Sequence, residues 1–315
     1  DVVSGDFPTV ISPNPEEPAA LAMAVEKAIE TDAELVMASD PDADRVGAAV
    51  KNNEGEWVLL NGNQTALMFV YYLITRWKEL GKINGKEYIV KTIVTTETIK
   101  TIAERNGVEM YDVYTGFKWI ANVMRENEGK KNYIGGGEES YGFLCEDFVR
   151  DKDAVSACVI LAEIAAWAKD QGLSLYQLLQ KIYVEYGFSK EKGISVVKKG
   201  KSGAEEIEAM MKKFRENPLT EIAGSKVTYF YDYSTLKGKD YAENETVTLD
   251  MPTTSNVLQY FTEDNTKVSI RPSGTEPKIK FYCEVHSKVK NIDELPEAEK
   301  AAEEKINQIK ASLGI

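Results

Sequence analysis

The sequence has little cysteine and histidine, with three residues of the first and one of the second among 315. Cys145, Cys158 and Cys283 lie far apart, so they have no paired spacing for a zinc site, and their odd number cannot pair completely in disulfides. We therefore expect a reducing compartment, the cytoplasm. The single histidine, His286, has no serine nucleophile pattern around it, which argues against a Ser-His-Asp hydrolase and favours a structural role.

Positive charge is also scarce, because 38 Lys and Arg stand against 51 Asp and Glu, for a net charge of −13. Non-specific nucleic-acid binding needs a basic surface, so no nucleic-acid partner is expected. No apolar run approaches the roughly 20 residues that span a bilayer, and no signal peptide opens the chain, so no membrane partner is expected either. Local clusters of Lys and Arg would have to bind any anionic substrate. No pattern in the sequence specifies an oligomeric state.

What is present is a globular composition, 43% hydrophobic, in a chain long enough for two or three domains. Residues 1–61 combine a helix over 18–30 with a strand and a hairpin. Residues 62–187 alternate strands and helices, as in βαβ units around a parallel sheet, and residues 188–315 indicate an α+β domain that ends in an amphipathic helix over 296–313. The predicted fold class is therefore α/β, with a C-terminal α+β domain.

An acidic loop over residues 39–45 is the first candidate site. Asp40, Asp42 and Asp44 occupy alternate positions directly after an apolar strand. Alternate side chains of an extended backbone point the same way, so these carboxylates can meet at one hard cation. Oxygen ligands of this kind suggest Mg²⁺ serving phosphoryl transfer, with Arg45 beside the ion for an anion. A solvated acidic loop is the alternative.

Two other motifs share part of this pattern. An EF-hand loop needs glycine at its sixth place and glutamate at its twelfth, where this chain has Arg45 and Lys51, so that interpretation fails. A haloacid-dehalogenase-type phosphatase also carries paired aspartates after a strand. Its pattern expects threonine or valine where Asp44 stands, which leaves it as the weaker rival.

The second candidate is the glycine-rich loop over residues 135–142, expected directly after a strand over 132–134. Its glycines would let the backbone approach a ligand, while Glu138 and Ser140, two residues apart, could address neighbouring sugar hydroxyls. The loop is not a GxGxxG fingerprint, because Ser140 stands where the last glycine belongs. A flexible turn is the alternative.

The third candidate is the loop over residues 271–277. The guanidinium of Arg271 can bind a phosphate bidentately, and the hydroxyls and amides of the loop add further donors. These donors come from Ser273, Gly274 and Thr275. A polar tight turn is the alternative. A fourth stretch, 115–119, lies at a predicted strand-to-helix junction, where Lys118 could exchange a proton with a sugar hydroxyl or could simply be solvated.

Taken together, these motifs resemble the α-D-phosphohexomutases, the phosphoglucomutase and phosphomannomutase superfamily. The resemblance also includes the entry segments 7–9 and 13–16, and it covers essentially the whole chain. It implies three similar α/β domains and a smaller α+β domain around a cleft. Residues 1–61 would then be most of domain two, residues 62–187 domain three and residues 188–315 domain four. The chain would thus hold two similar α/β domains, the first incomplete.

The resemblance also implies an activity for the intact enzyme, the interconversion of hexose 1-phosphate and hexose 6-phosphate through a phosphoserine and a bisphosphorylated sugar. Family members carry that serine in domain one, within a Thr-(Ala/Ser)-Ser-His-Asn-Pro type motif, and no such string occurs here. The nearest similar string, around Ser12, lacks the histidine, so Ser12 is not assigned as the nucleophile. We therefore expect a fragment that lacks the phosphoserine domain and is inactive alone.

The same resemblance implies residue roles. Asp40, Asp42 and Asp44 would hold Mg²⁺, and Arg45 would offset developing charge. Sugar hydroxyls would be held by Glu138 and Ser140, and the non-reacting phosphate by four residues: Arg271, Ser273, Gly274 and Thr275. Lys118 matches phosphoglucomutases, whereas many bacterial phosphomannomutases have histidine there. Phosphomannomutase, phosphopentomutase and a non-catalytic sugar-phosphate-binding protein remain alternatives.

Overall fold

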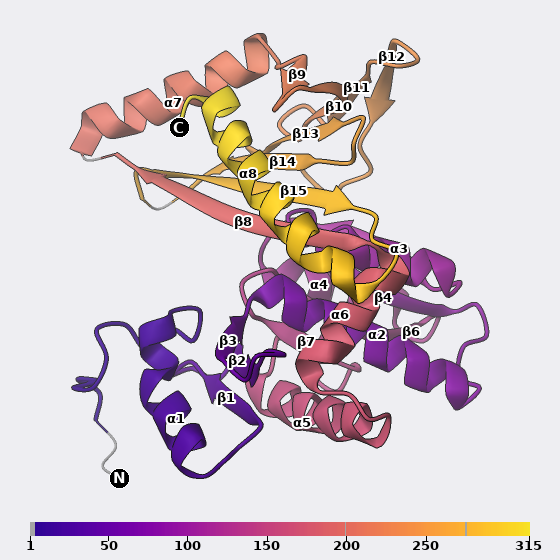
Figure 1. Cartoon of the computed structure of the whole chain (residues 1–315). Helices are drawn as coiled ribbons and strands as arrows, with labels where there is room; N and C mark the ends of the chain where they lie inside the picture. Colours follow the sequence, from indigo (N-terminus) through magenta and orange to yellow (C-terminus); the bar gives the residue numbers. More distant parts are fainter. Residues whose placement is uncertain (1–3, 199, 275) are drawn as a thin grey trace. The chain divides into compact units, whose positions relative to one another are not determined.

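The chain divides into two compact units, residues 1–186 and 187–315 (Figure 1). The computed structural model describes residues 4–198, 200–274 and 276–315. Within these described residues, no helix combines the length and the apolar character needed to cross a membrane. The predicted fold class, α/β followed by α+β, is confirmed, and each unit is described separately below.

The first unit begins with helix α1 (Pro18–Glu30), which has proline in its first turn, where no helical N–H bond is lost. A three-stranded antiparallel sheet follows, in the order β1-β2-β3, formed by β1 (Leu35–Ser39), β2 (Val46–Lys51) and β3 (Trp57–Leu60). Leu21 and Ala28 of the helix pack on Val36 and Ala49 of the sheet. Because Ser39 pairs with Val46, the acidic loop is the connection between β1 and β2.

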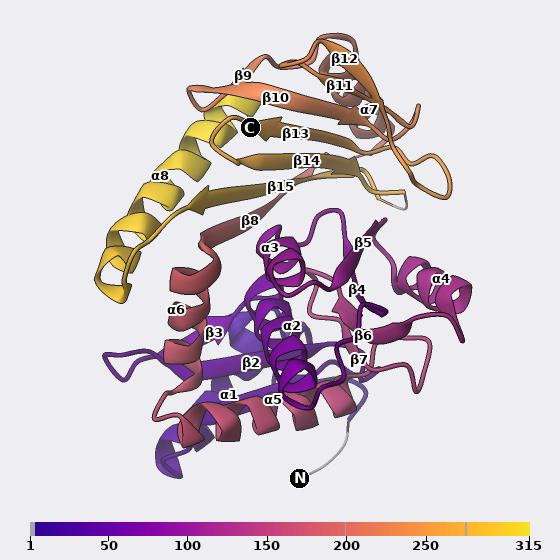
Figure 2. The same ribbon diagram turned by 90° about the vertical axis from the view of Figure 1, so that its right-hand side faces the viewer.

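Among the residues that the structure describes, a second sheet, in the order β5-β4-β6-β7, and five helices form the rest of the first unit (Figure 2). Its strands are β4 (Glu87–Thr92), β5 (Glu109–Val113), β6 (Asn132–Gly137) and β7 (Phe143–Cys145). The first three are parallel, as the alternating pattern predicts, and β7 adds an antiparallel edge. The helices are α2 (Gly62–Glu79), α3 (Thr98–Arg105), α4 (Phe117–Asn127), α5 (Ala154–Asp170) and α6 (Leu175–Tyr186).

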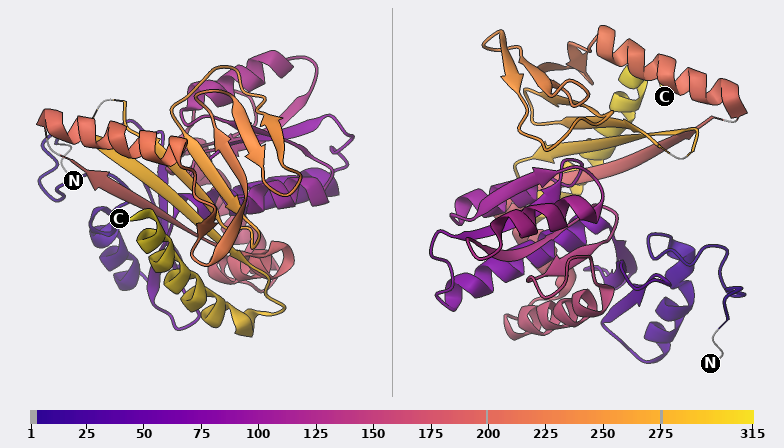
Figure 3. Two further views of the ribbon diagram at one scale, coloured as in Figure 1. Left: turned by 90° about the horizontal axis from the view of Figure 1, so that it is seen from above. Right: turned by 180° about the vertical axis from the view of Figure 1, so that it is seen from behind.

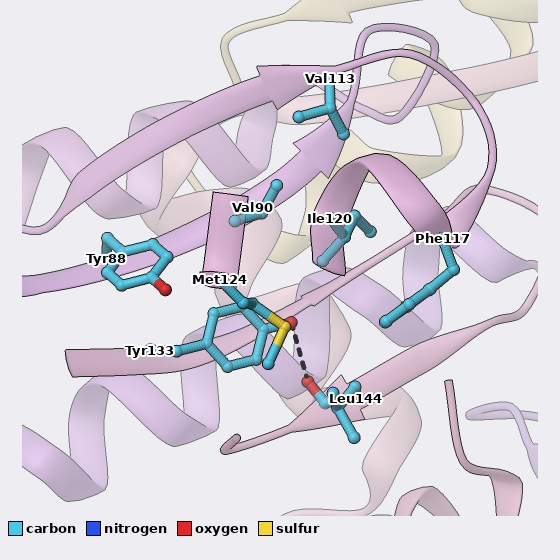
Figure 4. Packing of buried hydrophobic residues seen from close by; sticks show 8 residues of the cluster. All are labelled: Tyr88, Val90, Val113, Phe117, Ile120, Met124, Tyr133 and Leu144. Carbon is cyan, nitrogen blue, oxygen red and sulfur yellow. Dashed lines mark hydrogen bonds between the residues drawn. The ribbon is translucent and has the colours of Figure 1, made fainter. Parts of the chain in front are cut away.

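Helix α4 closes one hydrophobic core of this sheet (Figure 4). Phe117, Ile120 and Met124 recur at helical spacing and face strand residues such as Tyr88 and Val90, all of them buried. Helix α2 starts with a capping box, in which Asn61 accepts from the backbone N–H of Gln64 and Gln64 accepts from that of Asn61. The capping box fixes where α2 begins.

The predicted end of strand 132–134 is wrong, because β6 continues through Gly137. The three glycines at 135–137 are buried sheet residues that pack against protein. A Cβ at Gly136 would lie 2.4 Å from the Val90 carbonyl oxygen, and one at Gly137 would lie 2.5 Å from the Phe143 ring. Close packing inside the sheet explains the glycine run, so only residues 138–142 form a loop.

The second unit is one antiparallel sheet with two long helices packed on it (Figure 3). The strand order is β12-β11-β10-β13-β14-β15-β8, and β9 (Glu221–Ile222) pairs with β10. The strands are β8 (Phe188–Val197), β10 (Ser225–Asp232), β11 (Lys237–Asp240), β12 (Glu245–Thr248), β13 (Leu258–Thr262), β14 (Lys267–Pro272) and β15 (Lys278–Ser287). The helices are α7 (Gly200–Glu216), the 3₁₀ turn η1 (Ile292–Glu294) and α8 (Leu295–Leu313).

A buried ionic group in this sheet explains His286. The Glu284 carboxylate lies 2.9 Å from the Lys267 ammonium and 2.7 Å from His286 Nε2. Burial alone would raise the pKa of Glu284, but the charges of Lys267 and His286 hold it well below its usual range. Burial alone would lower the pKa of His286, and the Glu284 charge outweighs this and raises it. The histidine therefore takes part in the packing of the sheet.

Candidate functional site

The acidic loop brings its three carboxylates together. Asp40, Asp42 and Asp44 each offer an oxygen within 4.8 Å of the others. Asp40 is buried, and its Oδ1 accepts from the backbone N–H groups of Asp44 at 3.0 Å and Arg45 at 2.9 Å. Ala43 turns the chain with a positive φ of 57°. The turn between β1 and β2 thus holds the acidic side chains in the arrangement that their spacing predicts.

One atom of this loop indicates a cation. Asp44 Oδ1 is buried and has no hydrogen-bond partner among the described residues. A buried carboxylate oxygen without a hydrogen bond is costly, and three carboxylates this close repel one another. An oxygen-only donor set suits a hard divalent ion such as Mg²⁺, which keeps several waters and takes few protein ligands. The three aspartates therefore fit Mg²⁺, the metal that the family resemblance implies.

The guanidinium of Arg45 lies near two of these carboxylates, Asp40 and Asp44, at distances longer than a hydrogen bond. Its nitrogens lie 3.7 Å from Asp40 Oδ2, 3.8 Å from Asp44 Oδ1 and 3.6 Å from Glu16 Oε1. The side chain is 38% exposed. A guanidinium held only by long contacts can turn towards an anion that arrives at the loop.

The acidic loop and the segment 138–142 lie side by side, although they are far apart in the sequence. Arg45 and Gly142 form an antiparallel bridge, and Val46 N–H donates to the Tyr141 carbonyl at 3.1 Å. The N–H of Ala154 donates to the Ala43 carbonyl at 3.0 Å. Backbone hydrogen bonds therefore fix the position of the candidate sugar loop relative to the candidate metal loop.

Glu138 links the same segment to the start of α4. Its side chain is almost fully buried, and Oε1 accepts from Gly116 N–H at 2.7 Å. Gly116 occupies the N-cap position with a φ of 111°, a conformation that suits glycine. Lys118, the second residue of α4, is exposed, and its ammonium lies 5.1 Å from the centroid of the Trp119 ring. Ser140 is half-buried.

Lys152 is a site residue that the sequence analysis missed. Its ammonium lies 2.6 Å from Asp44 Oδ2 and 5.9 Å from the centroid of the Phe117 ring. Burial alone would lower the pKa of Lys152, but the ion pair with Asp44 outweighs it and the pKa is raised. A Cβ at Gly142 would lie 2.4 Å from Lys152 Cδ, so only glycine there leaves room for this side chain. In the sequence, Lys152 lies between Asp151 and Asp153, so its neighbours do not indicate that it pairs with the distant Asp44.

The phosphate-loop candidates belong to the second unit. Arg271 ends β14 directly opposite Lys280 of β15. Two cations at directly opposite positions repel each other, and a bound anion would relieve this. Ser273 donates its N–H to the Lys278 carbonyl at 2.7 Å, and its hydroxyl accepts from Glu276 N–H at 3.3 Å. Gly274 has open space where a Cβ would lie.

The predicted residues thus form two groups. The first unit brings together the three aspartates, Arg45, Glu138 and the start of α4. Arg271, Ser273 and Gly274 lie in the second unit, beside a groove of about 940 Å³ that Ser273 and Gly274 help to line. Thr275 lies outside the described residues. A common cleft for the two groups stays a prediction.

Comparison with known proteins identifies three consecutive domains of one family. The models described as phosphoglucomutase/phosphomannomutase domain II (alpha/beta/alpha), domain III (alpha/beta/alpha) and C-terminal domain match residues 2–55, 61–186 and 195–302. A phosphoglucomutase of Staphylococcus aureus is 38% identical over 290 residues, which are 92% of this chain and 51% of that protein. One of Staphylococcus saprophyticus is 34% identical over 294 residues, 93% of this chain and 52% of that protein.

The chain spans about half the length of the curated relatives it matches. Among solved structures, a phosphoglucomutase/phosphomannomutase family protein of Burkholderia thailandensis superposes with a TM-score of 0.62 at 19% identity. The superposition covers 99% of this chain and 54% of that one, and it shows that the two share a fold.

Proposed function

The chain belongs to the phosphoglucomutase/phosphomannomutase family, and on this premise we propose that it forms the cation-, sugar- and phosphate-binding part of a phosphoglucomutase. The reaction would interconvert hexose 1-phosphate and hexose 6-phosphate through a phosphoserine on a further domain. The single observation that supports this most is the contact between the acidic loop and the segment 138–142. It supports the proposal because phosphoryl transfer to a sugar would need the candidate cation loop and the candidate sugar loop to lie next to each other.

Each group has a chemical role in this proposal. Asp40, Asp42 and Asp44 would hold Mg²⁺, which when bound would polarise the transferring phosphoryl group. Arg45, free to turn, offsets the negative charge that develops beside the acidic loop. Glu138 already accepts one backbone N–H, and its carboxylate has lone pairs left to accept from sugar hydroxyls.

Phosphate at the other end of the sugar would be held by the second unit. Arg271 offers a planar fork of donors, and Lys280 opposite adds charge. Ser273 and Gly274 contribute donors at the same turn, and Thr275 is proposed with them. Lys118 is exposed at the start of α4 and is proposed to contact the sugar. Because phosphoglucomutases carry a basic residue of this kind here and many bacterial phosphomannomutases carry histidine, glucose is the hexose we propose.

Metal binding tests the first half of this proposal. Titration calorimetry with Mg²⁺ on the whole chain should show one site, and Asp42→Asn should weaken it by at least about tenfold. Asp170→Asn, which changes an exposed acid at the end of α5, is the matched control and should leave the affinity unchanged. Equal affinities in all three proteins would reject the assignment of the acidic loop.

Turnover tests the second half. The chain joined to the phosphoserine domain of a phosphoglucomutase should convert glucose 1-phosphate to glucose 6-phosphate in the presence of Mg²⁺, and the Asp42→Asn form should not. Binding of glucose 6-phosphate without turnover in the joined protein would favour the non-catalytic binding protein. Release of inorganic phosphate by the chain alone would favour the phosphatase.

A further inference from the structure

Two adjacent carboxylates at the end of β6 are held by different parts of the first unit. Glu138 is bonded to the start of α4, as described above. Glu139 reaches across to the neighbouring strand β4, where its Oε2 accepts from the hydroxyl of Thr92 at 3.0 Å and lies 3.5 Å from that of Thr95. The candidate sugar loop is therefore fixed on two sides by its own consecutive side chains.

The two threonines form a rigid support. Both are fully buried, and their hydroxyl oxygens lie 2.8 Å apart. The N–H of Thr95 also donates to the Thr92 carbonyl at 3.0 Å, which closes a turn at the carboxyl end of β4. A hydroxyl pair with so little freedom can hold a carboxylate in one orientation, because neither side chain has solvent to move into.

A buried lysine lies behind this turn. The ammonium of Lys91 contacts Asp112 at 2.7 Å and Glu97 at 3.0 Å, and it donates to the carbonyls of Thr92 and Thr95, both at 3.4 Å. Its side chain is 1% exposed. The same two threonines thus bind a cation through their carbonyls and a carboxylate through their hydroxyls, and the turn is held from both sides.

The loop backbone is confined as well. A Cβ at Gly62, at the start of α2, would lie 2.1 Å from the Glu139 carbonyl oxygen and 2.7 Å from the Tyr141 nitrogen. The N–H of Glu138 donates to the Gly142 carbonyl at 2.9 Å. Helix α2 and the threonine pair together leave the loop little room to shift.

We propose that Glu139 is a positioning residue, which through Thr92 and Thr95 sets the orientation in which Glu138 and Ser140 meet the sugar. This inference rests on the proposed function, since it needs a sugar at the loop. We call the contact of Glu139 with the two threonines the clamp. Without it, residues 138–142 would keep their backbone contacts with the acidic loop, but the side chains of Glu138 and Ser140 would sample several orientations. Sugar hydroxyls would then lose their aligned partners, and affinity for the sugar part of the ligand would fall.

The test compares glucose 6-phosphate with inorganic phosphate, titrated calorimetrically into the full chain with Mg²⁺ present. The dissociation constant for inorganic phosphate divided by that for glucose 6-phosphate measures what the sugar adds to binding. We expect Glu139→Ala and Thr92→Val each to reduce this ratio by about tenfold, with inorganic phosphate bound as before. Glu139→Gln and Thr92→Ser, which keep an acceptor and a hydroxyl, should retain most of it.

Two further measurements distinguish loss of the clamp from a general destabilisation of the first unit. The double variant Thr92→Val/Glu139→Ala should lose no more than Glu139→Ala alone, since that single variant already removes the carboxylate from both threonines. Hydrogen exchange should quicken at the Glu138 amide and stay unchanged at Val90, inside β4. If Glu139→Ala does not fold, Thr92→Val carries the same test, because it removes only the hydroxyl.

The outcomes are distinct. An unchanged ratio in Glu139→Ala or Thr92→Val would overturn the clamp, and so would an equal loss in Thr92→Ser and Thr92→Val. A wild-type chain that binds inorganic phosphate as tightly as glucose 6-phosphate would refute sugar recognition itself, and with it both the proposed function and the clamp.

Discussion

The ammonium of Lys152 lies 2.6 Å from Asp44 Oδ2, so one of the three clustered carboxylates is already paired on its outer oxygen. The other oxygen of Asp44 stays buried with no hydrogen-bond partner among residues of the described ranges. The lysine thus holds one oxygen of Asp44, and its positive charge opposes the binding of a cation at the acidic loop.

Replacing Lys152 by methionine should tighten Mg²⁺ binding by severalfold. The reason is coulombic, because ammonium and metal compete for the same carboxylate charge in a half-buried place. Titration calorimetry at fixed ionic strength measures this. Lys152→Arg, which keeps the charge, should bind the metal as the wild type does. Weaker binding in the methionine variant would mean that orientation of Asp44 outweighs repulsion.

Stability of the second unit should depend on the protonation of His286. The folded pKa of His286 is raised above the usual 6.5 because Glu284 is beside it, with Glu191 adding to the effect and Lys267 opposing it. A raised pKa contributes stability that is complete below the unfolded pKa and is lost as pH rises through the folded pKa. Urea unfolding should therefore give a lower free energy at pH 9 than at pH 6.

His286→Gln provides the control for this prediction. The variant cannot gain the proton, so its free energy of unfolding should change less between the two pH values than that of the wild type. An equal change in both proteins would assign the dependence to other groups.

The buried pair of Lys267 and Glu284 should be costly to break. Both side chains are at most 3% exposed, so Lys267→Met would leave the buried Glu284 carboxylate without its lysine partner. We expect a loss of about 3–5 kcal/mol in the free energy of unfolding. The double variant Lys267→Met/Glu284→Leu should lose less than the single one. Additive losses would show that the two groups do not depend on each other.

Gly136→Ala should destabilise the first unit by about 1–3 kcal/mol, because the new methyl would meet the Val90 carbonyl oxygen at 2.4 Å and backbone cannot move aside. Gly193→Ala is the matched control, since that strand glycine of β8 has open space around it. Chemical unfolding of both variants should separate them clearly. Equal effects would show that the strand relaxes around the added methyl.

Local patterns predicted the helices and the acidic loop well, but they missed several strands, among them β7, β8, β11 and β13. The predicted meeting of Asp40, Asp42 and Asp44 is confirmed, and a turn with a positive φ at Ala43, rather than an extended backbone, brings them together. The helix over 296–313 was likewise predicted from its period, and Ile306, Ile309 and Leu313 are buried as expected. In these cases the backbone geometry of one segment decides the outcome.

Features that depend on distant partners were missed. Strand β8 carries a run of charge from Lys190 to Lys192, which hides a strand pattern, yet it pairs with β15 along its whole length. Lys152 meets Asp44 only because the chain returns to the acidic loop after β7. The glycine run was expected to be a loop, because turn residues and tightly packed strand residues have the same composition.

The glycines of β6 also limit which sequences this fold can accept. A Cβ at Gly135 would lie 3.1 Å from the Leu73 side chain of α2 and 3.1 Å from the Phe143 ring of β7. Because the interior is closely packed, a side chain here would push the strand away from its neighbours. Glu138 follows the strand directly, so such a shift would also move the carboxylate proposed to bind the sugar.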